Sequence, residues 1–278
     1  MKQLAKSLIL IFLMAFGGLL SAQPMTVISF NIRYNSYNNI DGENGWPNRK
    51  AAVARMILEE RPVAIGLQEA LIDQLQYLDS ALPGYHRVGV GRDDGKEAGE
   101  FMAIYYDTTR LEQLSHRTRW LSETPDVPSK GWDAACYRTV TIAHFRDRRS
   151  GKEFQYLNTH LDHVGKTARA EGVKLIVNSL KESFMSDNVP VIVGGDMNST
   201  IEDKIFQSFY DANLKPAREL TKNSSYVDTY NAYGKEKSAL IDHFFVRNVK
   251  VKQFRTLDGN YGVPYISDHY PIAVVIGL

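Results

Sequence analysis

The chain has 278 residues, with 33 lysines and arginines against 32 aspartates and glutamates. A chain so close to neutral lacks the broad basic surface that binds nucleic acids without regard to sequence, although basic residues can still cluster locally. Cys136 is its one cysteine. An intrachain disulfide is therefore excluded, and we do not expect this thiol to act as a nucleophile.

The first 22 residues have the pattern of a secretory signal peptide. Lys2 and Lys6 precede the apolar stretch Leu8–Phe16, and small residues follow as far as Ala22. The apolar stretch is shorter than the roughly 20 residues of a membrane-spanning helix, so a membrane anchor is the weaker interpretation. We expect cleavage after Ala22, export to the periplasm or the medium, and a mature chain without a membrane span.

Residues 23–278 are expected to form a single domain, because no long linker or repeat divides them. Short runs of β-branched, aromatic and other apolar residues predict strands at Met25–Ile32, Val63–Gln68, Tyr85–Val90, Phe101–Tyr106, Thr139–Phe145, Phe154–Asn158, Val189–Val193, Ile241–Val246, Val249–Phe254 and Ile272–Ile276. Amphipathic patterns predict helices at Arg49–Glu60, Leu71–Ala81 and Gly165–Phe184. Their order favours mixed sheets packed together over one parallel sheet.

Polar side chains suited to metal binding or proton transfer stand at the ends of several predicted strands. Asn31 ends the first strand, and Glu69 follows the second, whose sequence suggests a buried strand. Considered alone, Asn31 is equally typical of a turn, and Glu69 of the first turn of a helix.

The segment THLDH at residues 159–163 allows two interpretations. His160 at a strand end suits contact with a phosphate. The segment also resembles the H-x-D-H pattern of dinuclear zinc hydrolases. That pattern needs another histidine two residues before His160, where this chain has Asn158. Zinc is therefore the weaker alternative.

Two later segments are more specific. In GGDMN, two glycines allow a tight turn at a strand end, and Asp196 and Asn198 can point at one place. In SDHYP, Asp268 beside His269 can couple the charge of a metal to a general base. Asp242 could orient that histidine by a hydrogen bond, although alone it is equally typical of a turn or of the surface.

The order of these segments is more informative than any one of them. SFNIR, LQE, NTH, GDMN, IDH and SDHYP follow one another as do the motifs of the endonuclease/exonuclease/phosphatase superfamily. The chain resembles this superfamily over nearly all of residues 25–276, and it looks closest to secreted bacterial members. The resemblance implies an α/β fold of the α+β type, a four-layered sandwich. In that fold two mixed β-sheets pack face to face, with helices on the outside.

The resemblance also implies a metal site and a catalytic group. The metal-site positions correspond to Asn31, Glu69 and Asp268, whose oxygen donors suit Mg²⁺ or Mn²⁺. The catalytic positions correspond to His160, Asp196, Asn198, Asp242 and His269. His160 matches the histidine that contacts the scissile phosphate, and Asp196 and Asn198 match the pair that orients the attacking water and stabilises the developing charge. His269 matches the general base or acid, with Asp242 as its partner.

We therefore expect a magnesium-dependent phosphoric ester hydrolase, either a phosphodiesterase or a phosphatase, that acts outside the cytoplasm by in-line attack of water. Its partner would be a phosphate ester such as a sugar phosphate or a nucleotide, with no obligate protein partner. A secreted nuclease, a zinc hydrolase and a non-catalytic binding protein remain as alternatives. We expect Arg92, Trp132 and Arg138 to bind substrate; weaker candidates are Asp93, Lys96, Glu100 and Arg169.

Overall fold

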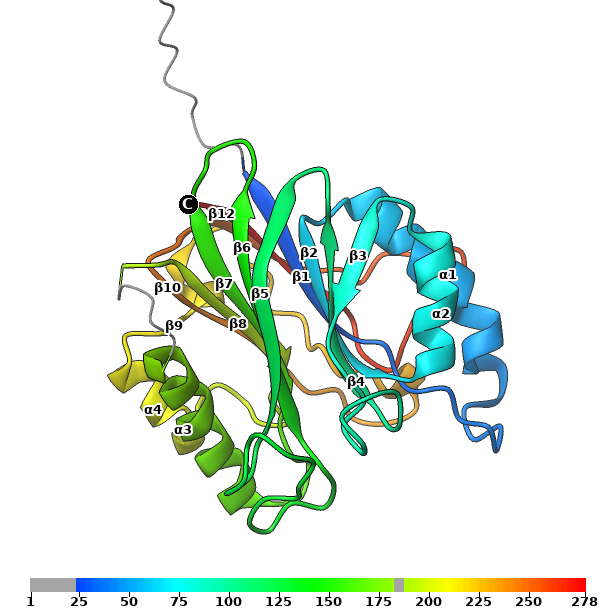
Figure 1. The fold of residues 1–278 in the computed structure, drawn as a ribbon. Helices are drawn as coiled ribbons and strands as arrows, with labels where there is room; N and C mark the ends of the chain where they lie inside the picture. Colours follow the sequence, from blue (N-terminus) through cyan, green and yellow to red (C-terminus); the bar gives the residue numbers. More distant parts are fainter. Residues whose placement is uncertain (1–23, 183–187) are drawn as a thin grey trace, which may run out of the picture.

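The computed structural model describes residues 24–182 and 188–278, so the expected signal peptide lies outside the described residues. Two six-stranded β-sheets face each other (Figure 1). The first contains, from edge to edge, β11 (Lys250–Thr256), β12 (Ile272–Gly277), β1 (Met25–Asn31), β2 (Ala64–Ala70), β4 (Phe101–Asp107) and β3 (Tyr85–Val88). The second contains β5 (Leu111–Trp120), β6 (Thr139–Asp147), β7 (Glu153–His160), β8 (Val191–Asp196), β10 (Asp242–Arg247) and β9 (Lys215–Pro216).

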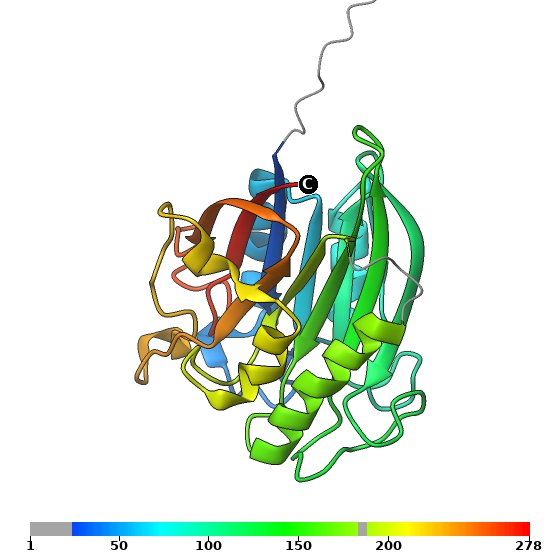
Figure 2. The same ribbon diagram turned by 90° about the vertical axis from the view of Figure 1, so that its left-hand side faces the viewer.

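Helices cover the outer faces of both sheets (Figure 2). Apolar side chains of α1 (Trp46–Glu60) and α2 (Ile72–Ala81) pack with those of β1 and β2, and those of α3 (Lys166–Glu182) and α4 (Gln207–Asp211) with the second sheet. A third apolar cluster fills the space between the sheets. Short 3-10 helices lie at Gly42–Asn44, Lys204–Phe206, Ala217–Leu220 and Ala232–Gly234. The predicted four-layered sandwich is therefore confirmed.

Some elements differ from the prediction. The first helix begins at Trp46, earlier than predicted, because Pro47 in the first turn is compatible with a helix start. Strand β5 was not predicted at all. Its central residues are polar and half-buried or exposed, so it lacks the alternation of apolar residues that marks a half-buried strand. No helix in residues 24–182 or 188–278 combines the length and the apolar character that crossing a membrane requires.

A polar contact joins the two sheets through their otherwise apolar interface. Asn158 of β7 is fully buried, and its Nδ2 donates to the carbonyls of Leu67 at 2.8 Å and Ala103 at 2.9 Å in the first sheet. The hydroxyl of Tyr156 donates to the carbonyl of Ile28 at 2.8 Å. Buried polar groups must be hydrogen-bonded, so these bonds favour one alignment of the sheets.

Strand directions bring the polar strand ends to one edge, at the lower end of Figure 1. Strands β1 and β2 run parallel, as do β7 and β8, so Asn31, His160 and Asp196 end their strands on the same side. Strands β10 and β12 run antiparallel to β8 and β1 and therefore begin there. In register, Asp242 lies directly opposite Asp196. Residues from four separate segments thus meet without any long loop.

We expect Gly195→Ala to destabilise the fold by about 1–3 kcal/mol, the usual range for an overpacked core. A Cβ at Gly195 would overlap the backbone carbonyl of Thr159 on the neighbouring strand, which cannot move without disturbing β7. Urea unfolding of the variant and the native protein measures the difference. The control is Gly259→Ala, where the nearest atoms lie 3.9 Å from the added Cβ. Equal stability of both variants would contradict this account.

Candidate active site

A cavity of about 480 Å³ opens at this edge. Residues of the predicted site that line it are Glu69, His160, Asp196, Asn198, Asp268 and His269. Asn31 and Asp242 are hydrogen-bonded to members of this group. The first sheet and its loops supply Asn31, Glu69, Asp268 and His269, and the second supplies the other four. The site therefore lies across the boundary between the two sheets.

Asp196 is the centre of the hydrogen-bonded group. Its Oδ2 accepts from Asn31 Nδ2 at 3.0 Å and lies 3.3 Å from His160 Nε2 and 3.7 Å from His269 Nε2. Its Oδ1 accepts from the backbone N–H of Asn198 at 2.9 Å. Burial raises the pKa of Asp196 to about 7, against the opposing effect of His269. A carboxylate with a pKa near neutrality is suited to accept a proton.

His269 is held by Asp242, whose Oδ2 lies 2.8 Å from His269 Nδ1. Thr229 holds the backbone near both residues. Its hydroxyl accepts from the backbone N–H of Asp242 at 3.0 Å, and its carbonyl accepts from the backbone N–H of Tyr270, which follows His269, at 2.7 Å. Burial alone would lower the pKa of His269, but Asp242 and Asp196 outweigh it and raise the pKa to about 10. His269 is therefore positively charged at neutral pH in this arrangement.

His160 has the opposite character. Burial lowers its pKa well below the usual range, and Arg138 and Arg92 add to that shift. Its Nε2 lies 3.0 Å from Asn198 Nδ2, and its buried Nδ1 has no hydrogen-bond partner within residues 24–182 and 188–278. Asn198 reaches this position with a φ of 48°, a left-handed conformation that asparagine tolerates better than most residues. His160 is therefore a neutral hydrogen-bonding group.

The predicted metal ligands Glu69 and Asp268 both face the guanidinium of Arg33. Arg33 Nη1 lies 3.9 Å from Glu69 Oε2, and Arg33 Nε lies 3.8 Å from Asp268 Oδ2. Burial raises the pKa of Asp268, and the charge of Glu69 adds to the effect. Carboxylate oxygens are the ligands that a hard divalent cation prefers, so the two side chains are suited to such a cation.

Asn31 links this pair of carboxylates to the catalytic group. Its Nδ2 donates to Glu69 Oε1 at 2.9 Å as well as to Asp196, and its Oδ1 accepts from the backbone N–H of Arg33 at 3.0 Å. In this arrangement the amide of Asn31 positions Glu69 and Asp196 relative to each other. Its part as a metal ligand stays a prediction.

Comparisons with known proteins agree with this architecture. The model of the endonuclease/exonuclease/phosphatase family matches residues 28–269. The chain belongs to this family. It is 35% identical to a mannosyl-6-phosphatase of Bacteroides thetaiotaomicron, with a TM-score of 0.86 over 91% of this chain and 100% of that one. An uncharacterized protein of Acanthamoeba polyphaga mimivirus is 25% identical over 90% of this chain and 99% of its own length.

More distant members of the family share the fold. The catalytic domain of human nocturnin is 20% identical, with a TM-score of 0.71 over 91% of this chain and 93% of that domain. The predicted resemblance to the endonuclease/exonuclease/phosphatase superfamily is therefore confirmed. The expectation of a hydrolase of phosphate esters is confirmed at the level of the family.

The zinc pattern of the sequence is not assembled in this family member. Asn158, which stands where that pattern needs a histidine, is turned into the sheet interface. Asp162 accepts backbone N–H groups of Ala135, Val164 and Gly165, and Arg138 Nε lies 3.2 Å from its Oδ2. These bonds hold the pKa of Asp162 well below its usual range despite its burial. Asp162 therefore serves to fix Arg138.

Two groups of side chains have potential ligand atoms within 4.8 Å of one another among the described residues. One is Asp196, Asp242 and His269, and the other is Cys136, Asp162 and His163. In the first group, the Asp242–His269 hydrogen bond already uses one atom of each residue. Glu69 and Asp268 both line the cavity, and their part as metal ligands stays a prediction.

The predicted substrate-binding residues are only partly brought together. Arg92 and Arg138 line the cavity, whereas Trp132 is not among the lining residues. Arg33 and Tyr230 line it too, and the sequence did not single them out. Arg33 lies two residues after Asn31, so the charge in SFNIR was the one available signal.

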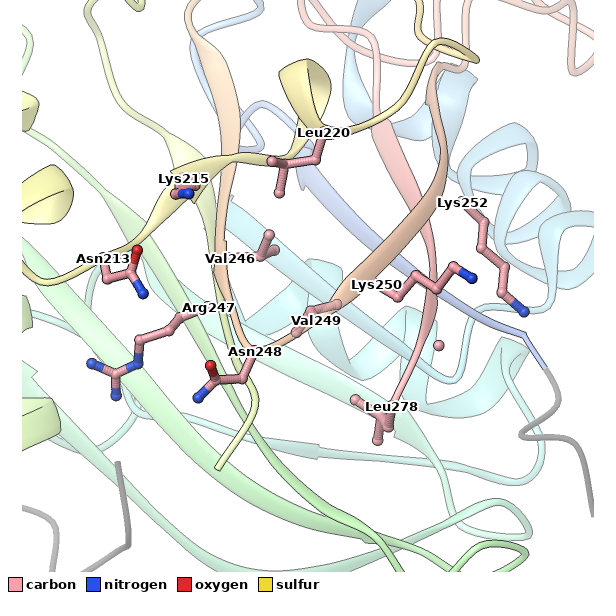
Figure 3. A pocket seen from close by; sticks show the side chains of 11 residues that line it. Asn213, Lys215, Leu220, Val246, Arg247, Asn248, Val249, Lys250, Lys252 and Leu278 are labelled. Carbon is pink, nitrogen blue, oxygen red and sulfur yellow. The ribbon is translucent and has the colours of Figure 1, made fainter. Parts of the chain in front are cut away.

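A larger cavity, of about 620 Å³, lies elsewhere on the protein (Figure 3). Its charged side chains are Lys215, Arg247, Lys250 and Lys252. None of the described residues that line it is a histidine, an aspartate or a glutamate. Its described lining therefore lacks the side-chain carboxylates and imidazoles that the predicted chemistry needs, and the smaller cavity is the candidate active site.

Proposed function

We propose that this protein is a divalent-metal-dependent phosphomonoesterase that acts on sugar phosphates outside the cytoplasm. The observation that carries the proposal is the arrangement of the catalytic group, the two metal-site carboxylates and Arg138 around one cavity. The similarity to a mannosyl-6-phosphatase over almost the whole chain supports a sugar phosphate as substrate. The near-neutral charge gives no support to a nuclease.

Arg138 is suited to bind the phosphate. It is 5% exposed. Its buried Nη1 has no hydrogen-bond partner in the part of the chain that the structure describes, while Asp162 and His163 hold the other nitrogens. A guanidinium fixed by such bonds offers its remaining N–H groups in a set direction. His160 Nδ1 is likewise buried and without a partner. Arg138 and His160 both line the cavity, where their N–H groups would donate to phosphate oxygens.

The chain's own residues supply the proton transfers. Water attacks phosphorus as the bond from phosphorus to the sugar oxygen breaks. Asp196 accepts the proton of the water, and His269, charged through Asp242, gives its proton to the departing sugar oxygen. The products are the free sugar and inorganic phosphate. A Mg²⁺ or Mn²⁺ ion held by Glu69 and Asp268 would supply positive charge that neutralises the phosphate.

A panel of phosphate esters tests this proposal. The purified protein is assayed with hexose 6-phosphates, p-nitrophenyl phosphate, bis-p-nitrophenyl phosphate and oligonucleotides, each with Mg²⁺, with Mn²⁺ and with a chelator. We expect metal-dependent release of phosphate from the monoesters. Full activity in excess chelator would contradict metal dependence, and cleavage of the diesters alone would contradict a monoesterase.

Export carries a separate prediction. Because the pattern of residues 1–22 is that of a signal peptide, protein recovered from the envelope or medium of the producing cell should begin at Gln23. Intact-mass measurement of that protein gives the first residue. Replacing the apolar Leu10 and Leu13 by arginine should keep the precursor in the cytoplasm. A chain retained there with its native N-terminus intact would refute export.

A further inference from the structure

The loop between β3 and β4 brings Arg92 and Glu100 into the cavity as a pair. Arg92 Nη1 lies 2.6 Å from Glu100 Oε2, and the two side chains are 14% and 16% exposed. Among the described residues, neither side chain makes a hydrogen bond to the catalytic group. The pair is therefore available to the part of a substrate that lies beyond the phosphate.

The loop that carries the pair is tightly bonded. The backbone N–H of Arg92 donates to the carbonyl of Glu100 at 3.1 Å, and that of Asp93 to the carbonyl of Ala98 at 3.0 Å. The side chain of Asp94 accepts the N–H groups of Lys96 and Ala98. Trp120 of β5 fixes the loop from outside, because its Nε1 donates to the carbonyl of Arg92 at 2.7 Å. The pair is thus preorganised before a ligand arrives.

We propose that Arg92 and Glu100 select the leaving group by binding hydroxyls of a neutral sugar. This inference rests on the proposed function. A hydroxyl both donates and accepts hydrogen bonds, so neighbouring hydroxyls match a carboxylate beside a guanidinium. Glu100 Oε1 has no hydrogen-bond donor among the described residues and can accept from a sugar.

The same carboxylate disfavours other phosphate esters. Burial raises the pKa of Glu100 to about 7, so above that pH Glu100 balances the charge of Arg92 and the pair does not attract a second phosphate as a free arginine would. A substrate with another anionic group at this distance from the scissile phosphate would meet a carboxylate that is only 16% exposed, where repulsion is stronger than in bulk water. Sugar bisphosphates and oligonucleotides are such substrates. Selectivity therefore arises from repulsion of these substrates as well as from attraction of the neutral sugar.

Steady-state kinetics of Glu100→Gln test the inference with mannose 6-phosphate, mannose 1,6-bisphosphate and p-nitrophenyl phosphate. The variant keeps a side chain of the same size but loses the charge. We expect KM for mannose 6-phosphate to rise about tenfold, as for loss of a hydrogen bond to a charged group. The ratio of kcat/KM for the 6-phosphate over the bisphosphate should fall at least about tenfold. For p-nitrophenyl phosphate, which has no sugar, kcat/KM should stay within about twofold.

Glu97→Gln is the matched control, because Glu97 is exposed on the same loop and does not line the cavity. It should leave all the kinetic constants unchanged. If Glu100→Gln does not fold, the native protein still decides, since it should hydrolyse the 6-phosphate far better than the bisphosphate.

Equal use of the two sugar phosphates by the native protein would overturn the inference, as would parallel losses on all substrates in Glu100→Gln. Either result would leave the proposed function standing. If the native protein hydrolyses neither p-nitrophenyl phosphate nor any hexose phosphate with Mg²⁺ or Mn²⁺, the proposed function and the inference both fail.

Discussion

His269→Ala is expected to lower kcat by a factor on the order of 10²–10⁴, the range typical of a general acid or base. His269 lines the cavity, lies 3.7 Å from Asp196 Oδ2 and is charged through its contact with Asp242. Without the imidazole, the group assigned to give a proton to the leaving oxygen is lost. The measurement is steady-state kinetics at saturating metal. His116→Ala on the exposed part of β5 is the control and should keep full activity.

The Asp242 side chain provides a second part of this test. Because it acts only through His269, Asp242→Ala should cost less than His269→Ala, and the double variant should lose almost nothing beyond His269→Ala. A double variant whose loss equals the product of the two single losses would show that the residues act independently. The hydrogen bond of 2.8 Å would then have no catalytic role.

Glu69→Gln is expected to weaken Mn²⁺ binding by more than the roughly 10–100-fold that loss of a ligand's supporting partner typically costs. Glutamine removes the charge of one of two carboxylates that lie beside Arg33 and keeps the size of the side chain. Asp268→Asn should have a similar effect. Calorimetric titration with Mn²⁺ in the absence of substrate measures the affinity directly. kcat/KM at fixed metal should fall in parallel.

Asp242→Ala and Asp258→Asn are the controls for metal binding. Asp242 is hydrogen-bonded to His269, and Asp258 is exposed near β11, so both variants should keep the native affinity for Mn²⁺. Loss of Mn²⁺ binding in Asp242→Ala would favour the alternative cation site formed by Asp196, Asp242 and His269. Unchanged binding in both Glu69→Gln and Asp268→Asn would exclude the assigned site.

The sequence predicted which polar side chains come together, because short motifs stand at or beside the ends of predicted strands. Asp196 at the end of β8 and His269 shortly before β12 both line the cavity, and their catalytic roles stay predictions. It did not predict β5, whose polar residues give no strand periodicity. Nor did it predict that Arg33 would lie beside Glu69 and Asp268, because that contact depends on the left-handed turn at Arg33.

The substrate side was harder to predict for a related reason. Arg92 and Glu100 are eight residues apart, and only the folded loop makes them partners. In the sequence, Trp132 is as good a candidate for substrate binding as Arg138. It is nevertheless not among the residues that line the cavity. The direction in which a loop side chain points depends on tertiary contacts, and these leave no periodic pattern in the sequence.

The buried Asn158 determines more than the packing of the two sheets. Its bonds to the carbonyls of Leu67 and Ala103 oppose any sliding of one sheet along the other. Such a slide would separate His269 on one sheet from Asp242 on the other. The amide of Asn158 therefore helps to keep these two residues in hydrogen-bonding distance, although it does not touch either of them. If the chain is cut into fragments that separate the two sheets, the mixed fragments should regain activity only when the bonds of Asn158 to Leu67 and Ala103 form again.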